Sequence, residues 1–180
     1  MAVIDATVEV IAAKGYHALS MRRVAEAAGI RAPSLYNHFN GKEDLIAAAM
    51  RERHPFVTLA PRLATLKGET VEALVYEAAG LVVDAVDARP PLLDLLLAEL
   101  VDLRGVHLPE ILPELIAALA PFLDQIEVVA GSRLRLDRMG FLRAFGAMLL
   151  SHLTLKYCAG LTRELSADVD ALLFGALGAP

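Results

Sequence analysis

The sequence lacks residues on which several classes of protein depend. It contains no tryptophan and a single cysteine, Cys158. One cysteine excludes an intramolecular disulfide and any site in which several cysteines bind a metal. Aromatic residues make up only 6% of the chain, although hydrophobic residues make up 56%. The core must therefore be built mainly from Leu, Ala, Val and Ile, and because Leu and Ala favour helices, this bias predicts an all-α protein.

Long apolar segments are also missing. The longest uninterrupted apolar run covers residues 115–123 and includes Pro121, whereas a helix that spans a membrane needs about 20 apolar residues. The first residues, MAVID, show neither the basic region nor the apolar region of a signal peptide. We therefore expect a cytoplasmic protein that does not bind a membrane.

An overall excess of positive charge is absent, since the net charge is −5. The charge is nevertheless distributed unevenly. Residues 1–54 contain seven Lys and Arg against six Asp and Glu, whereas residues 55–180 contain ten against sixteen. A slightly basic head followed by an acidic body is typical of a nucleic-acid-binding arm joined to another domain.

Helical periodicity and helix-ending residues divide the chain into about nine expected helices, and alternating β-branched runs that would indicate strands are scarce. Ser20 is a suitable N-cap, and Gly15 and Gly29 are suitable helix ends. The expected helices cover residues 4–14, 21–28, 33–39, 42–54, 69–88, 92–103, 109–130, 138–157 and 167–177. The predicted fold is all-α, with a three-helix head followed by a helical bundle.

The most informative stretch is residues 19–42, LSMRRVAEAAGIRAPSLYNHFNGK. Two short helices are joined by a tight turn at Gly29, where glycine permits a left-handed conformation. Ala25 is small where the helices cross, and Val24, Ile30 and Leu35 are apolar where the pair packs on neighbouring helices. This is the pattern of a helix-turn-helix, whose second helix enters the major groove of DNA.

The pattern resembles the TetR family of transcriptional regulators over about residues 4–50. The elements that carry the resemblance are Ala12-Ala13-Lys14-Gly15-Tyr16, Ser20–Gly29, Leu35-Tyr36-Asn37-His38-Phe39 and Gly41-Lys42-Glu43. The resemblance implies a DNA-binding domain over residues 1–54 and a ligand-binding and dimerisation domain over residues 55–180. It further implies that the chain is a dimeric repressor of a pseudo-palindromic operator, released by a small and apolar effector.

The resemblance also implies which residues contact DNA. Tyr36, His38 and Lys42 are expected to donate to phosphate oxygens, and the helix N-terminus at Lys42 favours a phosphate as well. Arg31 suits guanine and Asn37 suits adenine, although Asn37 is as easily a surface residue. Tyr16 and Phe39 are expected in the core. The full predicted DNA-binding set is Ser20, Met21, Arg22, Arg31, Ala32, Pro33, Ser34, Tyr36, Asn37, His38 and Lys42.

The last two expected helices are apolar over much of their circumference, which one small core cannot bury. In the family, the two C-terminal helices form a four-helix dimer interface, and a monomeric core is the alternative. The predicted interface residues are Phe141, Phe145, Met148, Leu149, His152, Leu153, Leu172 and Leu173. In the family an effector cavity lies among the middle helices of the body. The predicted pocket residues, each also explicable as plain core, are Met50, Tyr76, Leu96, Leu100, Leu119, Phe122 and Phe145.

Other classes of function lack support in the sequence. There is no G-x-S-x-G elbow, P-loop or G-x-G-x-x-G motif. His107 and Glu110 lack a third metal ligand nearby, so we expect no catalytic residue, metal or cofactor. Two alternatives stay open. One is a helical carrier or adaptor without a DNA target, and the other is a constitutive repressor without an effector.

Overall fold

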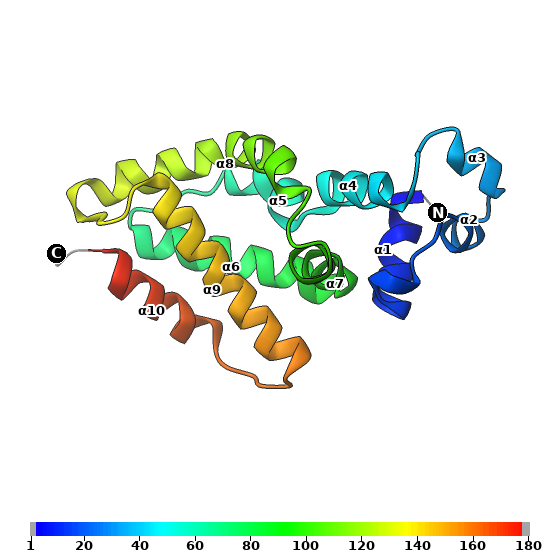
Figure 1. The fold of residues 1–180 in the computed structure, drawn as a ribbon. Coiled ribbons are helices and arrows are strands. Elements are labelled where there is room, and N and C mark those ends of the chain that lie inside the picture. Colours follow the sequence, from blue (N-terminus) through cyan, green and yellow to red (C-terminus); the bar gives the residue numbers. More distant parts are fainter. Residues whose placement is uncertain (1–2, 178–180) are drawn as a thin grey trace. The chain divides into compact units, whose positions relative to one another are not determined.

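The computed structural model describes residues 3–177, with the backbone only at Pro55, and over these residues the fold is all-α, as predicted. The helices shown in Figure 1 are α1 (Val3–Lys14), α2 (Met21–Ala28), α3 (Ala32–Tyr36), α4 (Lys42–Arg53), α5 (Pro55–Leu63), α6 (Val71–Ala88), α7 (Pro91–Leu97), α8 (Leu108–Ala130), α9 (Arg138–Cys158) and α10 (Leu165–Ala176). A 3₁₀ turn, η1, covers Tyr16–Ala18, and a π-helical turn, η2, covers Ala98–Asp102.

The chain forms two compact units. Unit 1 contains residues 1–58 and 88–116, and unit 2 contains residues 59–87 and 117–180. Unit 1 therefore combines α1–α4 with α7, η2 and the first turns of α8. These units are groups of contacting residues and do not test which segments fold independently, so the domain boundary after residue 54 stays a prediction.

α1, α2 and α4 begin and end within one residue of the predicted positions, whereas α3 ends at Tyr36 and α7 at Leu97, earlier than predicted. The hydroxyl of Ser20 accepts a hydrogen bond from the backbone N–H of Arg23 at 3.3 Å, which caps α2. Gly15 ends α1 with a φ of 75°, a value that favours glycine because it has no Cβ. α4 extends from Lys42 to Arg53, and its C-cap, His54, has a buried side chain. Burial lowers the pKa of His54 to about 4, so its imidazole is neutral near pH 7.

The core of unit 1 joins the head to a later segment of the chain. Apolar side chains of α1, α2, α3 and α4 pack in one cluster with Leu95, Ala98 and Ile111. The same cluster contains Val24 and Leu35, both fully buried, as the helix-turn-helix pattern predicts. The residues of α7 and η2 therefore complete the hydrophobic core beneath the helix-turn-helix.

One helix lies where the sequence indicated none. The expected helices leave residues 55–68 without one, yet α5 runs from Pro55 to Leu63, with the residues from Leu59 onward in unit 2. Proline is well tolerated at the first position of a helix, because its missing N–H would be unpaired there anyway. The centre of unit 2 is a cluster of three phenylalanines: Phe141 and Phe145 stack with ring centroids 6.1 Å apart, and Phe122 lies 6.2 Å from Phe145.

Residues 108–133, which include α8, are long and apolar enough to cross a membrane by length and composition alone. Within the protein, however, one side of α8 is buried. Its buried residues recur at intervals of three or four, as in an amphipathic helix packed on a core: Ile111, Leu115, Leu119, Phe122, Leu123 and Ile126. Glu114 and Asp124 lie exposed between them. This pattern is typical of the core helix of a globular protein.

Candidate nucleic-acid interface

The turn between α2 and α3 is closed by backbone hydrogen bonds. Gly29 is left-handed, with φ 70° and ψ 28°. Its N–H donates to the carbonyl of Glu26 at 3.1 Å, and the N–H of Ile30 donates to the carbonyl of Ala25 at 2.9 Å. This pair of bonds is a Schellman motif, which fixes the direction in which the chain leaves a helix. The motif and the buried side chains of Val24 and Leu35 set the position of α3 relative to α2.

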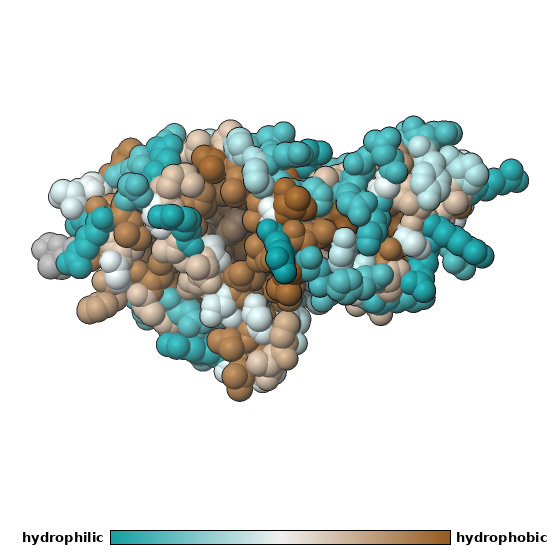
Figure 2. All heavy atoms as spheres, viewed as in Figure 1, coloured by the Kyte–Doolittle hydropathy of each residue, from teal (hydrophilic) through white to brown (hydrophobic). Residues whose placement is uncertain are grey.

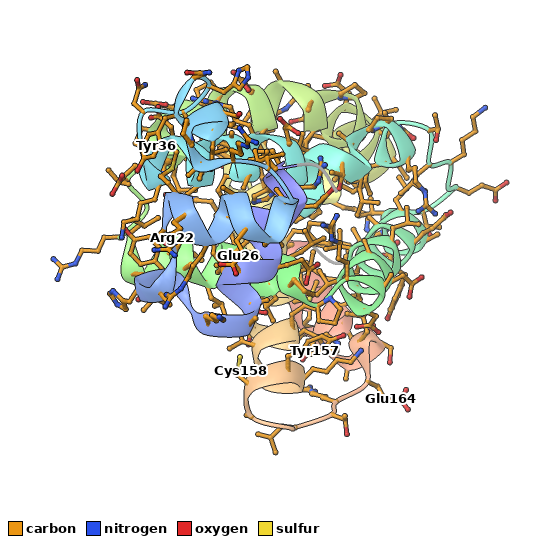
Figure 3. All side chains as sticks on the ribbon, turned by 90° about the vertical axis from the view of Figure 1, so that its right-hand side faces the viewer. Arg22, Glu26, Tyr36, Tyr157, Cys158 and Glu164 are labelled. Atoms are coloured by element: carbon orange, nitrogen blue, oxygen red, sulfur yellow. The ribbon has the colours of Figure 1, made fainter. Side chains whose placement is uncertain are left out.

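The face of the head formed by α2 and α3 presents most of the predicted DNA-binding residues to solvent. In Figure 3, which looks onto the head, α2 and α3 with Arg22 and Tyr36 face the viewer, and 56% of Tyr36 is exposed. Figure 2 shows mostly hydrophilic residues over these helices. The exposed members of the set are Arg22, Arg31, Pro33, Ser34, Tyr36, Asn37 and His38, and Ser20, Ala32 and Lys42 are half-buried.

Met21 is the exception in the predicted set. Its side chain is 6% exposed and packs in the core of unit 1. The prediction that the side chain of Met21 contacts DNA is therefore wrong for this conformation. Only the backbone of Met21, in the first turn of α2, remains available for a contact. Met21 is apolar and follows the N-cap directly, so it is placed where α2 meets the rest of the head.

The arginine side chains on this face differ in whether they have a partner within the protein. The guanidinium of Arg23 donates to the backbone carbonyl of Ala18 and so fixes the η1 turn against α2. Within residues 3–177, neither Arg22 nor Arg31 forms a salt bridge. These two side chains therefore keep an uncompensated positive charge on the exposed face, which is the property that a phosphate contact requires.

The N-terminus of α4 lies at the edge of the same face. Its N-cap, Gly41, is extended and supplies no side-chain hydrogen bond, so the first N–H groups of the helix have no helical partner. The backbone and side-chain amides of Asn40 donate to Asp44 Oδ2 at 2.9 and 2.7 Å. These two hydrogen bonds lower the pKa of the Asp44 carboxyl. The ammonium of Lys42, the first residue of α4, lies 4.4 Å from the ring centroid of Tyr16.

The other end of α4 is tied to α1 and to the later segment of unit 1. Asp5 Oδ1 accepts hydrogen bonds from Arg53 Nε at 3.0 Å and from Arg89 at 2.7 Å. The two guanidinium groups lower the pKa of Asp5 below its usual range. Arg51 pairs with Glu110 at 2.8 Å. Ion pairs as well as apolar contacts therefore join residues 89–110 to α1 and α4.

Glu99 and His107 form a buried pair that sequence reasoning missed. The side chain of Glu99 is 0% exposed, although a surface position is the usual expectation for an acidic residue. Its two oxygens accept from the backbone N–H of His107 and contact His107 Nδ1, each at 2.8 Å. The pair closes the loop between η2 and α8, in which Arg104 and Gly105 have positive φ values. The many leucines around Glu99 were the sequence signal for its burial, because they indicate that the helix containing Glu99 is itself buried.

Most of the predicted dimer-interface residues are packed inside unit 2. Phe141, Phe145, Leu149, His152, Leu153 and Leu173 are buried within the single chain, and only Met148 and Leu172 are half-exposed. His152 Nδ1 lies 2.8 Å from Asp168 Oδ2, a contact that joins α9 to α10. The six buried side chains are therefore core residues. The accessible apolar side chains of these two helices are instead Met139, Leu155, Tyr157 and Phe174.

The predicted pocket residues do not form one group. Met50, Leu96 and Leu100 lie in unit 1, whereas Tyr76, Leu119, Phe122 and Phe145 lie in unit 2. Within unit 2, Phe122 and Phe145 are in contact in the buried phenylalanine cluster. The hydroxyl of Tyr76 donates to Asp170 of α10, and this carboxylate raises the pKa of Tyr76. The role of all seven residues in ligand binding stays a prediction.

A helix-turn-helix head combined with helical units defines a class of DNA-binding regulators. Residues 3–49 match the family described as bacterial regulatory proteins, tetR family. The fatty acid metabolism regulator protein of Bacillus subtilis (strain 168) is 40% identical over 53 residues, which cover 29% of this chain and 27% of that regulator. These matches confirm the resemblance that the helix-turn-helix residues indicated.

Two solved structures extend the likeness to the whole fold. A TetR family transcription regulator from Marinobacter aquaeolei VT8 has a TM-score of 0.80 at 16% identity, with 98% of this chain and 94% of that chain covered. The regulator FadR from Bacillus subtilis, in complex with stearoyl-CoA, has a TM-score of 0.68 at 20% identity, with 96% and 94% covered. The all-α fold is thus shared with these two structures over nearly the whole chain.

Proposed function

We propose that this protein is a dimeric transcriptional repressor that binds a pseudo-palindromic operator in the cytoplasm. The observation that carries the proposal is the exposed face of α2 and α3, where Arg22, Arg31, Tyr36 and His38 lie on a rigid helix-turn-helix beside the N-terminus of α4. In this proposal residues 1–54 bind DNA, and residues 55–180 bind the effector and the second subunit. Selection of binding sites from random duplexes tests it, and the absence of any selectable site would reject it.

Phosphate contacts and base contacts should respond differently to substitution. Lys42→Ala should weaken binding to all sequences alike, because a phosphate carries no sequence information. Asn37→Ala should instead change the preference at one base pair by about 1–3 kcal/mol. Competition between the selected duplex and its single-base variants measures both effects. Lys67→Ala removes an exposed lysine of unit 2 and is the matched control. A change of sequence preference in Lys42→Ala would contradict these roles.

We infer that dimerisation uses the exposed side of α9 and α10 rather than the buried residues predicted from the sequence. Figure 2 shows hydrophobic residues on the visible face over this pair of helices. Phe174 of α10 is 89% exposed, which is unusual for a large aromatic residue in water. Next to it, Gly175 has open space around the position of a Cβ, so a second helix can approach closely.

Phe174→Asp should give a folded monomer. The side chain has almost no contacts to lose within its own chain, whereas a charge in an apolar interface is strongly unfavourable. Light scattering measures the mass, and circular dichroism confirms the fold. Val101→Asp is the control, because Val101 is also exposed but belongs to unit 1. A Phe174→Asp dimer of unchanged stability would place the interface elsewhere.

We further propose that the effector carries a long apolar chain. The structurally similar FadR was solved with stearoyl-CoA, and the head resembles that of a fatty acid metabolism regulator. Unit 2 offers an apolar interior around Phe122, Phe141 and Phe145. An acyl chain is matched to such an interior because its transfer from water is favourable by about 0.8 kcal/mol for each buried CH₂ group. A displacement of residues 89–110 would then act on α4 through the Arg51–Glu110 pair and through Asp5, which binds both Arg89 and Arg53.

Stearoyl-CoA should lower the affinity for the selected operator by about 5–150-fold, the usual range of allosteric coupling. By reciprocity the operator should weaken the binding of stearoyl-CoA by the same factor. Titration of each ligand in the presence and absence of the other measures the two factors, with free coenzyme A as the control. If stearoyl-CoA binds and leaves operator affinity unchanged, the constitutive repressor becomes the better description. If stearoyl-CoA binds and no operator exists, a helical carrier without a DNA target becomes the better description.

A further inference from the structure

The ammonium of Lys42 has an aromatic partner rather than an acidic one. Its Nζ lies 4.4 Å from the centroid of the Tyr16 ring, within the roughly 6 Å over which a ring face attracts a cation. Glu43 and Asp44 follow Lys42 directly, but residues one and two positions apart do not share a face of a helix. Within residues 3–177, no salt bridge involves Lys42. The ring therefore holds the cation in place without cancelling its charge.

The position of Tyr16 depends on two features of the head. Gly15 ends α1 with a φ of 75°, so the η1 turn begins at Tyr16. The ring is half-buried and packs on the core of unit 1, while the guanidinium of Arg23 bonds the carbonyl of Ala18 at the end of the same turn. The ring is thus a rigid platform, whereas the lysine side chain above it has four rotatable bonds. Ordering such a side chain has an entropic cost, which the ring lowers by holding the ammonium before DNA binds.

We propose that Tyr16 is a positioning residue for DNA binding, because its ring holds the Lys42 ammonium ready to contact a backbone phosphate at the N-terminus of α4. The inference rests on the proposed DNA-binding function. The ring covers one side of the ammonium, and the remaining N–H groups stay available to phosphate oxygens. The uncapped first turn of α4 offers backbone N–H groups to the same anion. Tyr16 itself need not touch DNA.

A double-mutant cycle on the full chain tests the proposal. The probe is a duplex recovered by selection with the wild-type protein, and fluorescence anisotropy gives the dissociation constants of wild type, Tyr16→Leu, Lys42→Ala and the double variant. Tyr16→Leu should weaken binding by about two- to five-fold for each head of the dimer, which corresponds to one exposed cation–π contact per head. In the Lys42→Ala background the same change should have no effect. Tyr16→Phe keeps the ring and should bind like wild type.

Other outcomes would overturn the proposal. Equal weakening by Tyr16→Leu in both backgrounds would mean that Tyr16 only supports the fold of the head. Loss of binding in Tyr16→Phe would mean that its hydroxyl contacts DNA directly. If wild type binds a selected duplex but the cycle shows no coupling, this inference fails while the DNA-binding function stands. If wild type binds no duplex, both fail together.

A measurement without DNA keeps the proposal testable even if Tyr16→Leu does not fold. Protons above an aromatic ring resonate upfield, so the ε-methylene protons of Lys42 should lie upfield of those of Lys67, an exposed lysine of unit 2. The shift should persist in Tyr16→Phe. An ordinary shift for Lys42 in the wild-type protein would show that the ammonium does not stay over the ring, and would overturn the proposal.

Discussion

Operator affinity should fall by about 10²–10³-fold when the salt concentration rises from 50 to 200 mM, because each neutralised phosphate releases counterions. Lys42, Arg22 and Arg31 are accessible in each head, and two heads make roughly four to six cationic phosphate contacts. The slope of log affinity against log salt is then about −4 to −5. Anisotropy titrations of the selected duplex at several salt concentrations measure it.

The same titrations identify which cations are responsible. Lys42→Ala removes two contacts from a dimer and should make the slope less steep by about 2. Lys67→Ala should leave it unchanged, since Lys67 belongs to unit 2. A flat salt dependence for the wild-type protein on a palindromic site would contradict the assignment of these residues to phosphates.

His107→Ala should lower the free energy of unfolding by roughly 1–3 kcal/mol, because it leaves one oxygen of a buried carboxylate without a hydrogen-bond partner. Glu99 is fully buried; its Oε2 contacts the His107 ring, and its Oε1 accepts from the backbone N–H of residue 107, which the substitution retains. A domain is stable by only about 5–15 kcal/mol, so this loss is large. Urea titration followed by circular dichroism measures it. His107→Asn retains a donor for Glu99 and should lose less.

Two comparisons show whether the loss comes from the buried charge. Combining His107→Ala with Glu99→Gln should regain much of the stability, since the amide can remain hydrogen-bonded without a charge. His17→Ala breaks another contact between a histidine and a carboxylate of η2, at 3.3 Å from Asp102, but the side chain of His17 is 85% exposed. An exposed pair contributes about 0–1 kcal/mol. Equal losses from His17→Ala and His107→Ala would rule out a special role for the buried pair.

Local features of the head could be predicted from the sequence because they depend on neighbouring residues. Ser20 caps α2 and Gly29 closes its end, since a cap and a left-handed turn involve only a few consecutive residues. The burial of Val24 and Leu35 follows from helical periodicity. The exposed face with Arg22 and Tyr36 then follows as the opposite side of the same helices.

Errors arose where a side chain's surroundings come from distant parts of the chain. Apolar residues of α9 predicted for the dimer interface, such as Leu149 and Leu153, are buried by other helices of the same chain. Periodicity identifies an apolar face and does not identify what covers it. The helix α5 was missed because proline was read as a break, although Pro55 occupies the first helical position, where it fits.

By itself, the sequence determined the all-α class, the helix-turn-helix and the resemblance of the head to the TetR family, because helix propensity, capping and spacing are properties of short segments. Only the tertiary structure decided that residues 88–116 pack with the head, that Glu99 is buried against His107, and that Lys42 lies over Tyr16. These partners are separated along the chain or lie on different helices. Their contacts depend on how the helices pack, which no local pattern specifies.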